Sequence, residues 1–124
     1  MLREGPFSAR LHGLAEYVIG AFFIAAPFIF GFDSNVAVAI AIVGGLALIL
    51  MAATAQTGPR ITGIVPVGFH VLFDVVLAGF LVASPFIFGF SGEPAPTGLF
   101  IGIGVLHVLL TIGTRFLPAR AEQP

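Results

Sequence analysis

Four apolar runs of about 20 residues each constrain the fold of this chain most strongly. A helix of about that length spans the ~30 Å hydrocarbon core of a bilayer. The predicted membrane spans run from about Leu11 to Phe32, Asn35 to Ala55, Val65 to Phe90 and Thr97 to Phe116. The breaks between them are short and rich in turn-forming residues. The pattern therefore predicts two tight helical hairpins joined by a slightly longer link.

The composition supports a membrane protein. Hydrophobic residues make up 58% of the chain and charged residues 9%, whereas a soluble domain carries roughly a quarter charged residues. So few charges cannot cover a water-facing surface, and we expect an all-α integral membrane protein in contact with the lipid bilayer. The chain contains no cysteine, which excludes thiolate chemistry, and its formal net charge of -1 without a basic patch argues against nucleic acid as a partner.

An internal repeat organises the four spans. Sliding the sequence by 58 positions aligns residues 12–32 with residues 70–90, and eleven of the 21 aligned pairs are identical. The predicted unit is one helical hairpin, with repeat 1 in residues 1–58 and repeat 2 in residues 59–124. Because each unit contains two spans, both copies enter the membrane from the same side. This predicts parallel repeats related by a pseudo-two-fold axis along the membrane normal.

The arginines predict the orientation of the chain. They stand before the first span, between the second and third, and after the fourth: Arg3, Arg10, Arg60, Arg115 and Arg120. An even number of spans places all five on one side of the membrane, with Asp33 and Glu93 in the opposite loops. This positive-inside pattern predicts a multi-pass protein of the plasma (inner) membrane with both termini in the cytoplasm.

The hexapeptide PFIFGF occurs at residues 27–32 and again at residues 85–90. Pro27 and Pro85 each remove one backbone donor and press on the carbonyl four residues earlier, so the helix bends or stops there. Gly31 and Gly89 allow the left-handed turn that ends a helix. We interpret the hexapeptide as a helix-exit motif used once per hairpin, with direct contact to a ligand as the alternative.

The segments around this motif resemble a known family. ASPFIFGF (83–90) and AAPFIFGF (25–32), each with an acid eleven residues before the proline, are similar to the SPW-repeat membrane proteins. Those small prokaryotic proteins carry Ser-Pro-Trp in the first of two spans per repeat, and FDSNVAVAIAIVGG (32–45) also resembles the start of their second span. Here Phe28 and Phe86 replace the tryptophan, and Ala26 replaces the first serine. The resemblance implies a multi-pass membrane protein and no established chemistry.

Two acids are predicted to lie inside the membrane. Glu16 and Asp74 are about two turns inside their spans, with His12 and His70 four residues earlier on the same helix face. An ionisable group at this depth is a candidate functional residue because burying it unpaired is costly. Brought together by the pseudo-symmetry, the two pairs could form a two-histidine, two-carboxylate metal site or a proton relay.

The interpretation we favour for these pairs is structural. Each histidine would hydrogen-bond its own acid, and Arg10, Arg60 or Arg115 would reach in to neutralise the charge. On this interpretation the pairs hold helices together, and we assign no metal to them.

His107 is predicted near the middle of the fourth span, and it aligns with Ile49, so it is not part of the repeat. A single imidazole at that depth could ligate a haem iron or a chlorophyll magnesium, or bond a neighbouring backbone carbonyl or hydroxyl. His107, with His12 and His70, is thus a candidate cofactor ligand, and the identity of any cofactor is left open.

Small residues recur every four positions in the two second-of-pair spans. They are Ala37, Ala41 and Gly45 in one span and Gly98 and Gly102 in the other. Such spacing lets helix backbones approach closely, so we expect these residues to mark packing faces within the bundle or toward a partner.

The functional expectation is a non-catalytic membrane subunit or accessory protein. No phosphate-cradling loop and no serine triad can be assembled from the sequence. We expect the partners to be other membrane subunits or further copies of the chain. The alternatives are a haem- or (bacterio)chlorophyll-binding subunit and a small oligomeric ion or proton transporter.

Overall fold

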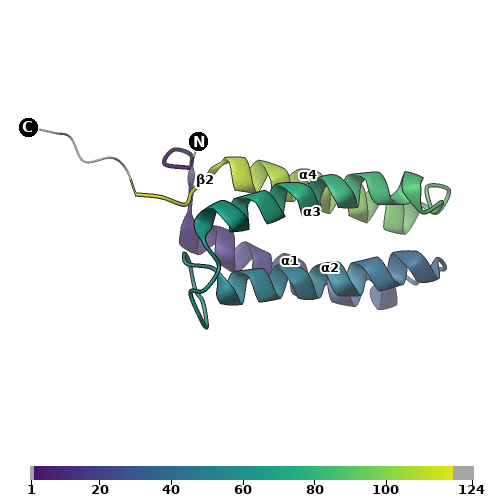
Figure 1. Ribbon diagram of the computed structural model, residues 1–124. Helices are drawn as coiled ribbons and strands as arrows, with labels where there is room; N and C mark the ends of the chain where they lie inside the picture. The colour runs from purple at the N-terminus through teal and green to yellow at the C-terminus, as the bar shows by residue number, and fades with distance from the viewer. Residues whose placement is uncertain (1, 119–124) are drawn as a thin grey trace, which may run out of the picture.

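The computed structural model describes residues 2–118, which form four long helices and one two-stranded sheet (Figure 1). The elements are β1 (Phe7–Ser8), α1 (Ala9–Ile29), α2 (Asn35–Thr54), α3 (Val67–Ile87), α4 (Pro94–Ile112) and β2 (Thr114–Arg115). Each helix is long and apolar enough to cross a membrane. The predicted all-α membrane fold with four spans is confirmed.

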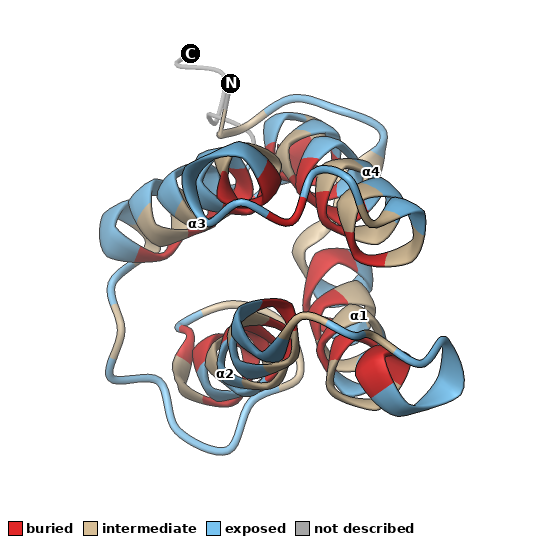
Figure 2. Ribbon diagram, turned by 90° about the vertical axis from the view of Figure 1, so that its right-hand side faces the viewer, coloured by how far each residue is buried: buried red, intermediate tan, exposed pale blue. Residues whose placement is uncertain are grey.

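The helices run side by side as two antiparallel pairs, α1 with α2 and α3 with α4 (Figures 1 and 2). Buried residues gather on the inward-facing sides of the helices, and exposed residues cover the outside (Figure 2). Strand β1 pairs in parallel with β2 at one end of the bundle, which we call the terminal end. The loops between paired helices lie at the other, the hairpin end.

The described arginines and the acids of the two hairpin loops lie at opposite ends of the bundle, with Glu4 at the terminal end beside the arginines. The link between α2 and α3, which carries Arg60, lies at the terminal end with β1 and β2 (Figure 1). Arg3, Arg10 and Arg115 also belong to terminal-end segments, and Arg120 is outside the described residues. Asp33 and Glu93 lie in the two loops of the hairpin end.

The first span ends earlier than predicted, at Ile29 instead of Phe32. Gly31 adopts a left-handed backbone with φ of 62°, which stops the helix there. The amide of Phe32 then donates to the carbonyl oxygen of Pro27 at 3.0 Å. This bond, from two residues beyond the cap back into the last turn, is the signature of a Schellman motif.

The second copy of the hexapeptide has the same geometry. Helix α3 ends at Ile87 rather than Phe90, Gly89 has a φ of 76°, and the amide of Phe90 donates to the carbonyl oxygen of Pro85 at 2.9 Å. Identical residues thus build identical helix ends in both hairpins.

Helix α4 is shifted toward the N-terminus relative to the predicted span of Thr97 to Phe116. It begins at Pro94, which suits the first helical position because no amide donor is needed there. It ends at Ile112 because the next residues leave the helix to form β2. The boundaries of α2 and the start of α3 lie within two residues of the prediction.

The two hairpins are joined at the hairpin end by one carboxylate. Glu93 accepts hydrogen bonds from the amides of Asp33, at 3.0 and 3.1 Å, and of Ser34, at 3.0 Å. A negative group beside the first turn of α2 is also favoured by the helix dipole.

An aromatic core fills the hairpin half of the bundle. The ring centroids of Phe23 and Phe100 are 4.9 Å apart, and those of Phe90 and Phe100 are 5.0 Å apart, both edge to face. The buried members of this core are Phe23, Ala37, Ala41, Leu81, Phe90, Phe100 and Ile103.

Glycines set the spacing within each hairpin. A Cβ atom added to Gly45 would lie 2.5 Å from the carbonyl oxygen of Gly20, so α1 and α2 touch through their backbones. In the second hairpin Gly104 has this role, because its Cβ would lie 2.8 Å from a backbone oxygen of α3. Gly98 and Gly102 instead face outward, with nothing within 4 Å of an added Cβ.

Candidate functional site

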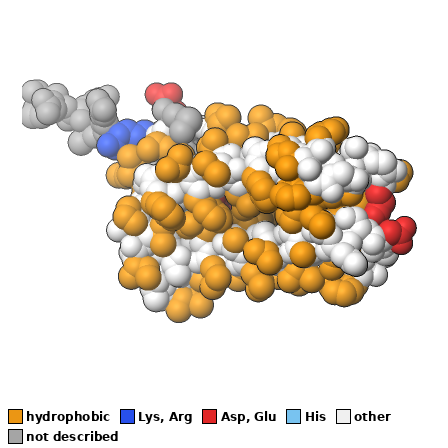
Figure 3. All heavy atoms as spheres, turned by 45° about the vertical axis from the view of Figure 1, so that its right-hand side comes forward, with side chains coloured by type: hydrophobic (Ala, Val, Ile, Leu, Met, Phe, Trp, Pro, Cys, Tyr) orange, Lys and Arg blue, Asp and Glu red, His pale blue; other side chains and the backbone are white. Residues whose placement is uncertain are grey.

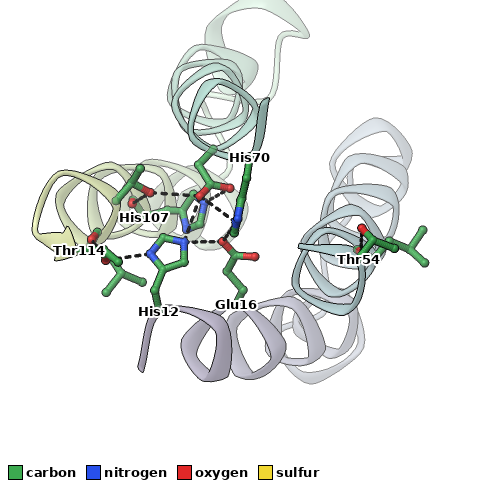
Figure 4. A network of polar contacts seen from close by, with 10 residues as sticks. His12, Glu16, Thr54, His70, His107 and Thr114 are labelled. Atoms are coloured by element: carbon green, nitrogen blue, oxygen red, sulfur yellow. Dashed lines mark hydrogen bonds and ion pairs between the residues drawn. The ribbon is translucent and has the colours of Figure 1, made fainter. Parts of the chain in front are cut away.

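Five ionisable side chains from three helices meet toward the terminal end of the bundle (Figure 4). We call them the histidine–carboxylate cluster: His12 and Glu16 from α1, His70 and Asp74 from α3, and His107 from α4. The four-residue spacing within α1 and α3 puts each histidine above its acid on the inward face. All five residues are at most 2% exposed.

Each acid lies between both repeat histidines. Nε2 of His12 is 2.5 Å from Oε1 of Glu16 and 3.0 Å from Oδ2 of Asp74. Nε2 of His70 is 2.8 Å from Oε1 of Glu16 and 3.3 Å from Oδ2 of Asp74. One ligand atom from each of the four residues falls within 4.8 Å of the other three. The cluster therefore joins the two hairpins to each other.

His107 completes the cluster from α4. Its Nε2 is 3.3 Å from Oδ1 of Asp74, and its ring centroid is 5.8 Å from that of His12. The predicted position near the middle of the span is wrong, because α4 ends at Ile112, only five residues later. Counting helical rise from the correct helix end would have placed this histidine at the depth of the other two.

Thr114, which no sequence motif marks, orients His12. The hydroxyl of Thr114 donates to the carbonyl oxygen of Leu110 at 2.5 Å, so its oxygen is left to accept from Nδ1–H of His12 at 3.0 Å. This hydrogen bond assigns the proton of a neutral His12 to Nδ1. The lone pair on Nε2 then faces the two carboxylates.

No arginine neutralises the acids within the described part of the chain. Every ion pair that Glu16 or Asp74 makes there is with a histidine. The side chains of Arg60 and Arg115 bond backbone carbonyl groups instead, and Arg10 is exposed. The carboxylates thus depend on the histidines, or on something bound between them, for their positive partner.

Several polar atoms of the cluster are buried without a hydrogen-bond partner. They are Oε2 of Glu16, Oδ1 of Asp74, Nδ1 of His70 and both ring nitrogens of His107. Buried polar atoms are normally paired because leaving one unpaired costs about 1–3 kcal/mol. Their concentration in one place makes the cluster a candidate site for water or a bound ion.

Aromatic and terminal segments close the cluster from the terminal end. The ring of Phe116 lies edge to face against those of His12 and His70, with centroids 4.7 and 5.4 Å away, and it is 3% exposed. The β1–β2 pairing, Phe7 with Thr114 and Ser8 with Arg115, holds the chain around it in place. The cluster is therefore enclosed on that side as well.

The other residues singled out in the sequence lie elsewhere. The four helix-exit residues, Pro27, Gly31, Pro85 and Gly89, are at the hairpin end. Ala37, Ala41 and Gly45 lie in helix-packing contacts, and Gly98 and Gly102 lie on the outer surface of α4.

A family model described as the SPW repeat domain matches residues 10–114, a range that contains the whole cluster and both copies of the hexapeptide. A search of curated proteins returned no match. No solved structure matched either.

Proposed function

We propose that this chain, which belongs to the SPW repeat family, is a non-catalytic subunit that packs against the membrane helices of a larger complex. Outside its four spans the described chain consists of short loops and two-residue strands. Such segments leave little material for a water-exposed active site. The chemistry of a complex would then reside in its partners.

The observation that carries this proposal is an apolar cavity of about 300 Å³ between α2 and α3, the α2–α3 groove. Its α2 wall contains the small residues Ala39, Gly44 and Ala47, and its α3 wall contains Phe73, Leu77 and Phe80. In a bilayer, small residues let a second helix approach closely, and packing of side chains drives helix association. We infer that a transmembrane helix of another subunit occupies this groove.

The outer surface offers further apolar contact. Hydrophobic side chains cover much of the flank, and acidic side chains are seen at the hairpin end (Figure 3). On α4, Gly98 and Gly102 are exposed beside Leu106, which is 54% exposed, and Leu109, which is 59% exposed. This face of α4 combines small and bulky residues, as membrane helix contacts do.

The proposed location is the plasma membrane, with both termini in the cytoplasm. The ground is the distribution of arginine, since Arg3, Arg10, Arg60 and Arg115 belong to terminal-end segments and the hairpin-end loops carry acids and no arginine. Short loops with excess arginine stay in the cytoplasm.

The geometry weighs against the two alternatives. Nε2 of each histidine lies within 3.3 Å of a carboxylate oxygen, and no histidine lines the apolar cavities between α2 and α3 or between α3 and α4, which does not suit a haem or chlorophyll ligand. An ion or proton route would have to pass the layer of Phe23, Leu81 and Phe100 that fills the interior beyond the cluster. The accessory role fits both observations.

Two matched substitutions test the groove. Val43, 65% exposed, lines the α2–α3 groove, while Val18, 68% exposed, lies on α1. Val43→Phe would fill the groove, and Val18→Phe adds the same ring outside it. Tagged parent and variants would be purified from the native host in mild detergent, and the co-purifying subunits identified. We expect Val43→Phe to lose a subunit that Val18→Phe retains, and identical partners for both variants would overturn the proposal.

A further inference from the structure

We propose that the histidine–carboxylate cluster holds one divalent transition-metal ion of the Zn²⁺ class, bound between the two repeats. Its ligands are Nε2 of His12 and His70 and one carboxylate oxygen each of Glu16 and Asp74, with Nε2 of His107 beside them as a fifth donor. The site does not depend on a partner subunit, because all five side chains belong to this chain.

The spacing of the donor atoms fits such an ion. Zinc binds nitrogen and oxygen at about 2.0–2.2 Å in a tetrahedron, so ligand atoms around it lie roughly 3.3–3.6 Å from one another. Three of the four nitrogen–oxygen contacts between the repeat residues measure 2.8, 3.0 and 3.3 Å. Around a tetrahedral ion the 2.5 Å contact between His12 and Glu16 must open by roughly 1 Å, and the 2.8 and 3.0 Å contacts by roughly half an ångström. The four side chains are thus already gathered, and small side-chain shifts bring them to the spacing of a metal site.

The charges of the cluster also call for a cation. Glu16 and Asp74 bring two negative charges into a buried site that no arginine of the described chain reaches. A divalent ion with neutral imidazoles brings the sum to zero, which removes the large cost of burying unpaired carboxylates.

Thr114 orients the His12 ring for metal binding. With its Nδ1–H donated to Thr114, the neutral ring points an unprotonated Nε2 at two carboxylate oxygens. In the neutral ring this arrangement is repulsive, and either a proton on Nε2 or a metal ion among the three atoms relieves it. Metal-binding histidines typically donate their second ring nitrogen in this way, which sets the tautomer and the ring orientation.

The unpartnered atoms supply an independent indication. Nε2 of His107 and Oδ1 of Asp74 are fully buried and have no hydrogen-bond partner, although they lie 3.3 Å apart at the edge of the cluster. Oε2 of Glu16 is unpartnered too. An ion would engage atoms that are otherwise left buried and unsatisfied.

The donor set indicates the class of ion. Imidazole nitrogens with carboxylate oxygens suit zinc and neighbouring first-row divalent metals, whereas Mg²⁺ and Ca²⁺ prefer shells of oxygen ligands. The chain has no cysteine, so the thiolate ligands that select softer ions are missing.

The test is metal loading of the full chain in detergent. The purified parent would be stripped with EDTA, incubated with Zn²⁺ or Mg²⁺, freed of excess ion and analysed for metal by mass spectrometry. We expect about one zinc per chain, the stoichiometry of a single four- or five-donor site, and no retained magnesium. Glu16→Gln with Asp74→Asn should abolish zinc retention. Glu93→Gln, which changes a carboxylate at the hairpin end, is the matched control and should retain it.

Two single variants keep the test decisive if the double variant fails to fold. Thr114→Val removes the hydrogen bond to His12 without touching a ligand and should weaken zinc binding roughly 10–100-fold. His107→Gln should weaken it as well. Parent protein without zinc after loading, or unchanged zinc affinity in both single variants, would overturn the site. Co-purification of partner subunits with Val43→Phe is a separate measurement. The accessory-subunit proposal and the metal-site proposal can therefore be refuted independently of each other.

Discussion

Nε2 of His70 lies 2.8 Å from Oε1 of Glu16, an acid that stands 54 residues earlier in the other repeat. The reciprocal contact, from His12 to Asp74, measures 3.0 Å. Each histidine therefore contacts the acid of the other repeat as well as the acid of its own. The full set of contacts forms only when the two hairpins are assembled, and the cluster ties the hairpins to each other.

Substituting one acid tests whether the cluster stabilises the contact between the two hairpins. Glu16→Leu leaves His12 and His70 without one of their shared partners in a buried site, and we expect a loss of about 3 kcal/mol or more in the free energy of unfolding. Glu16→Gln keeps a hydrogen-bonding oxygen at the same place and should cost ~1 kcal/mol, the scale of interhelical polar contacts in membranes. Both would be measured by denaturant unfolding in detergent with EDTA present. Equal stability of the two variants would contradict a stabilising role of the cluster between the hairpins.

The glycine contact between α1 and α2 can be tested with two neighbouring positions. A Cβ on Gly45 would lie 2.5 Å from the backbone oxygen of Gly20, whereas a Cβ on Gly44 would lie 3.5 Å from its nearest neighbour, an ordinary contact. Gly45→Ala should therefore destabilise by ~1–3 kcal/mol through overpacking. Gly44→Ala should be neutral or better. Thermal unfolding in detergent compares them, and a reversed order would refute the close backbone approach.

Replacing glycine by alanine should destabilise the protein at the two helix ends and stabilise it inside α4. Gly31→Ala and Gly89→Ala place a Cβ on a left-handed backbone and should each cost about 1 kcal/mol. Gly102→Ala changes an exposed glycine inside α4, where there is open space, and should stabilise by roughly 0.5–1 kcal/mol. The unfolding midpoints of the three variants relative to the parent give the answer. Stabilisation by all three would show that the helices do not end in the left-handed turn.

The proposed orientation is open to direct measurement. Reporter fusions after Arg60 and at the C-terminus should be cytoplasmic, and fusions at Asp33 or Glu93 should be on the outside, because arginine-bearing loops are retained in the cytoplasm. A paired reporter, with alkaline phosphatase active outside and a fluorescent protein active inside, makes each position its own control. One fusion on the wrong side would exclude this orientation.

Several features were predictable from local sequence. The number of spans follows from apolar run length, which bilayer thickness sets. The 58-residue repeat also placed the His12–Glu16 pair and the His70–Asp74 pair at the same end, because two units of two spans must enter from the same side. The glycine-ended helix exits were likewise predictable, although the helices end three residues earlier than the apolar runs do.

The tertiary structure alone decided which way each helix faces. Gly104 packs against α3 while Gly98 and Gly102 face outward, and His107 joins the cluster from a helix outside the repeat pattern. Arg60 and Arg115 donate to backbone carbonyl groups rather than to the acids. In a water-soluble protein a polar stripe would reveal the outer face of a helix. In a bilayer the lipid-facing and inward-facing surfaces are both apolar, so the rotation of a helix about its axis leaves little trace in its sequence.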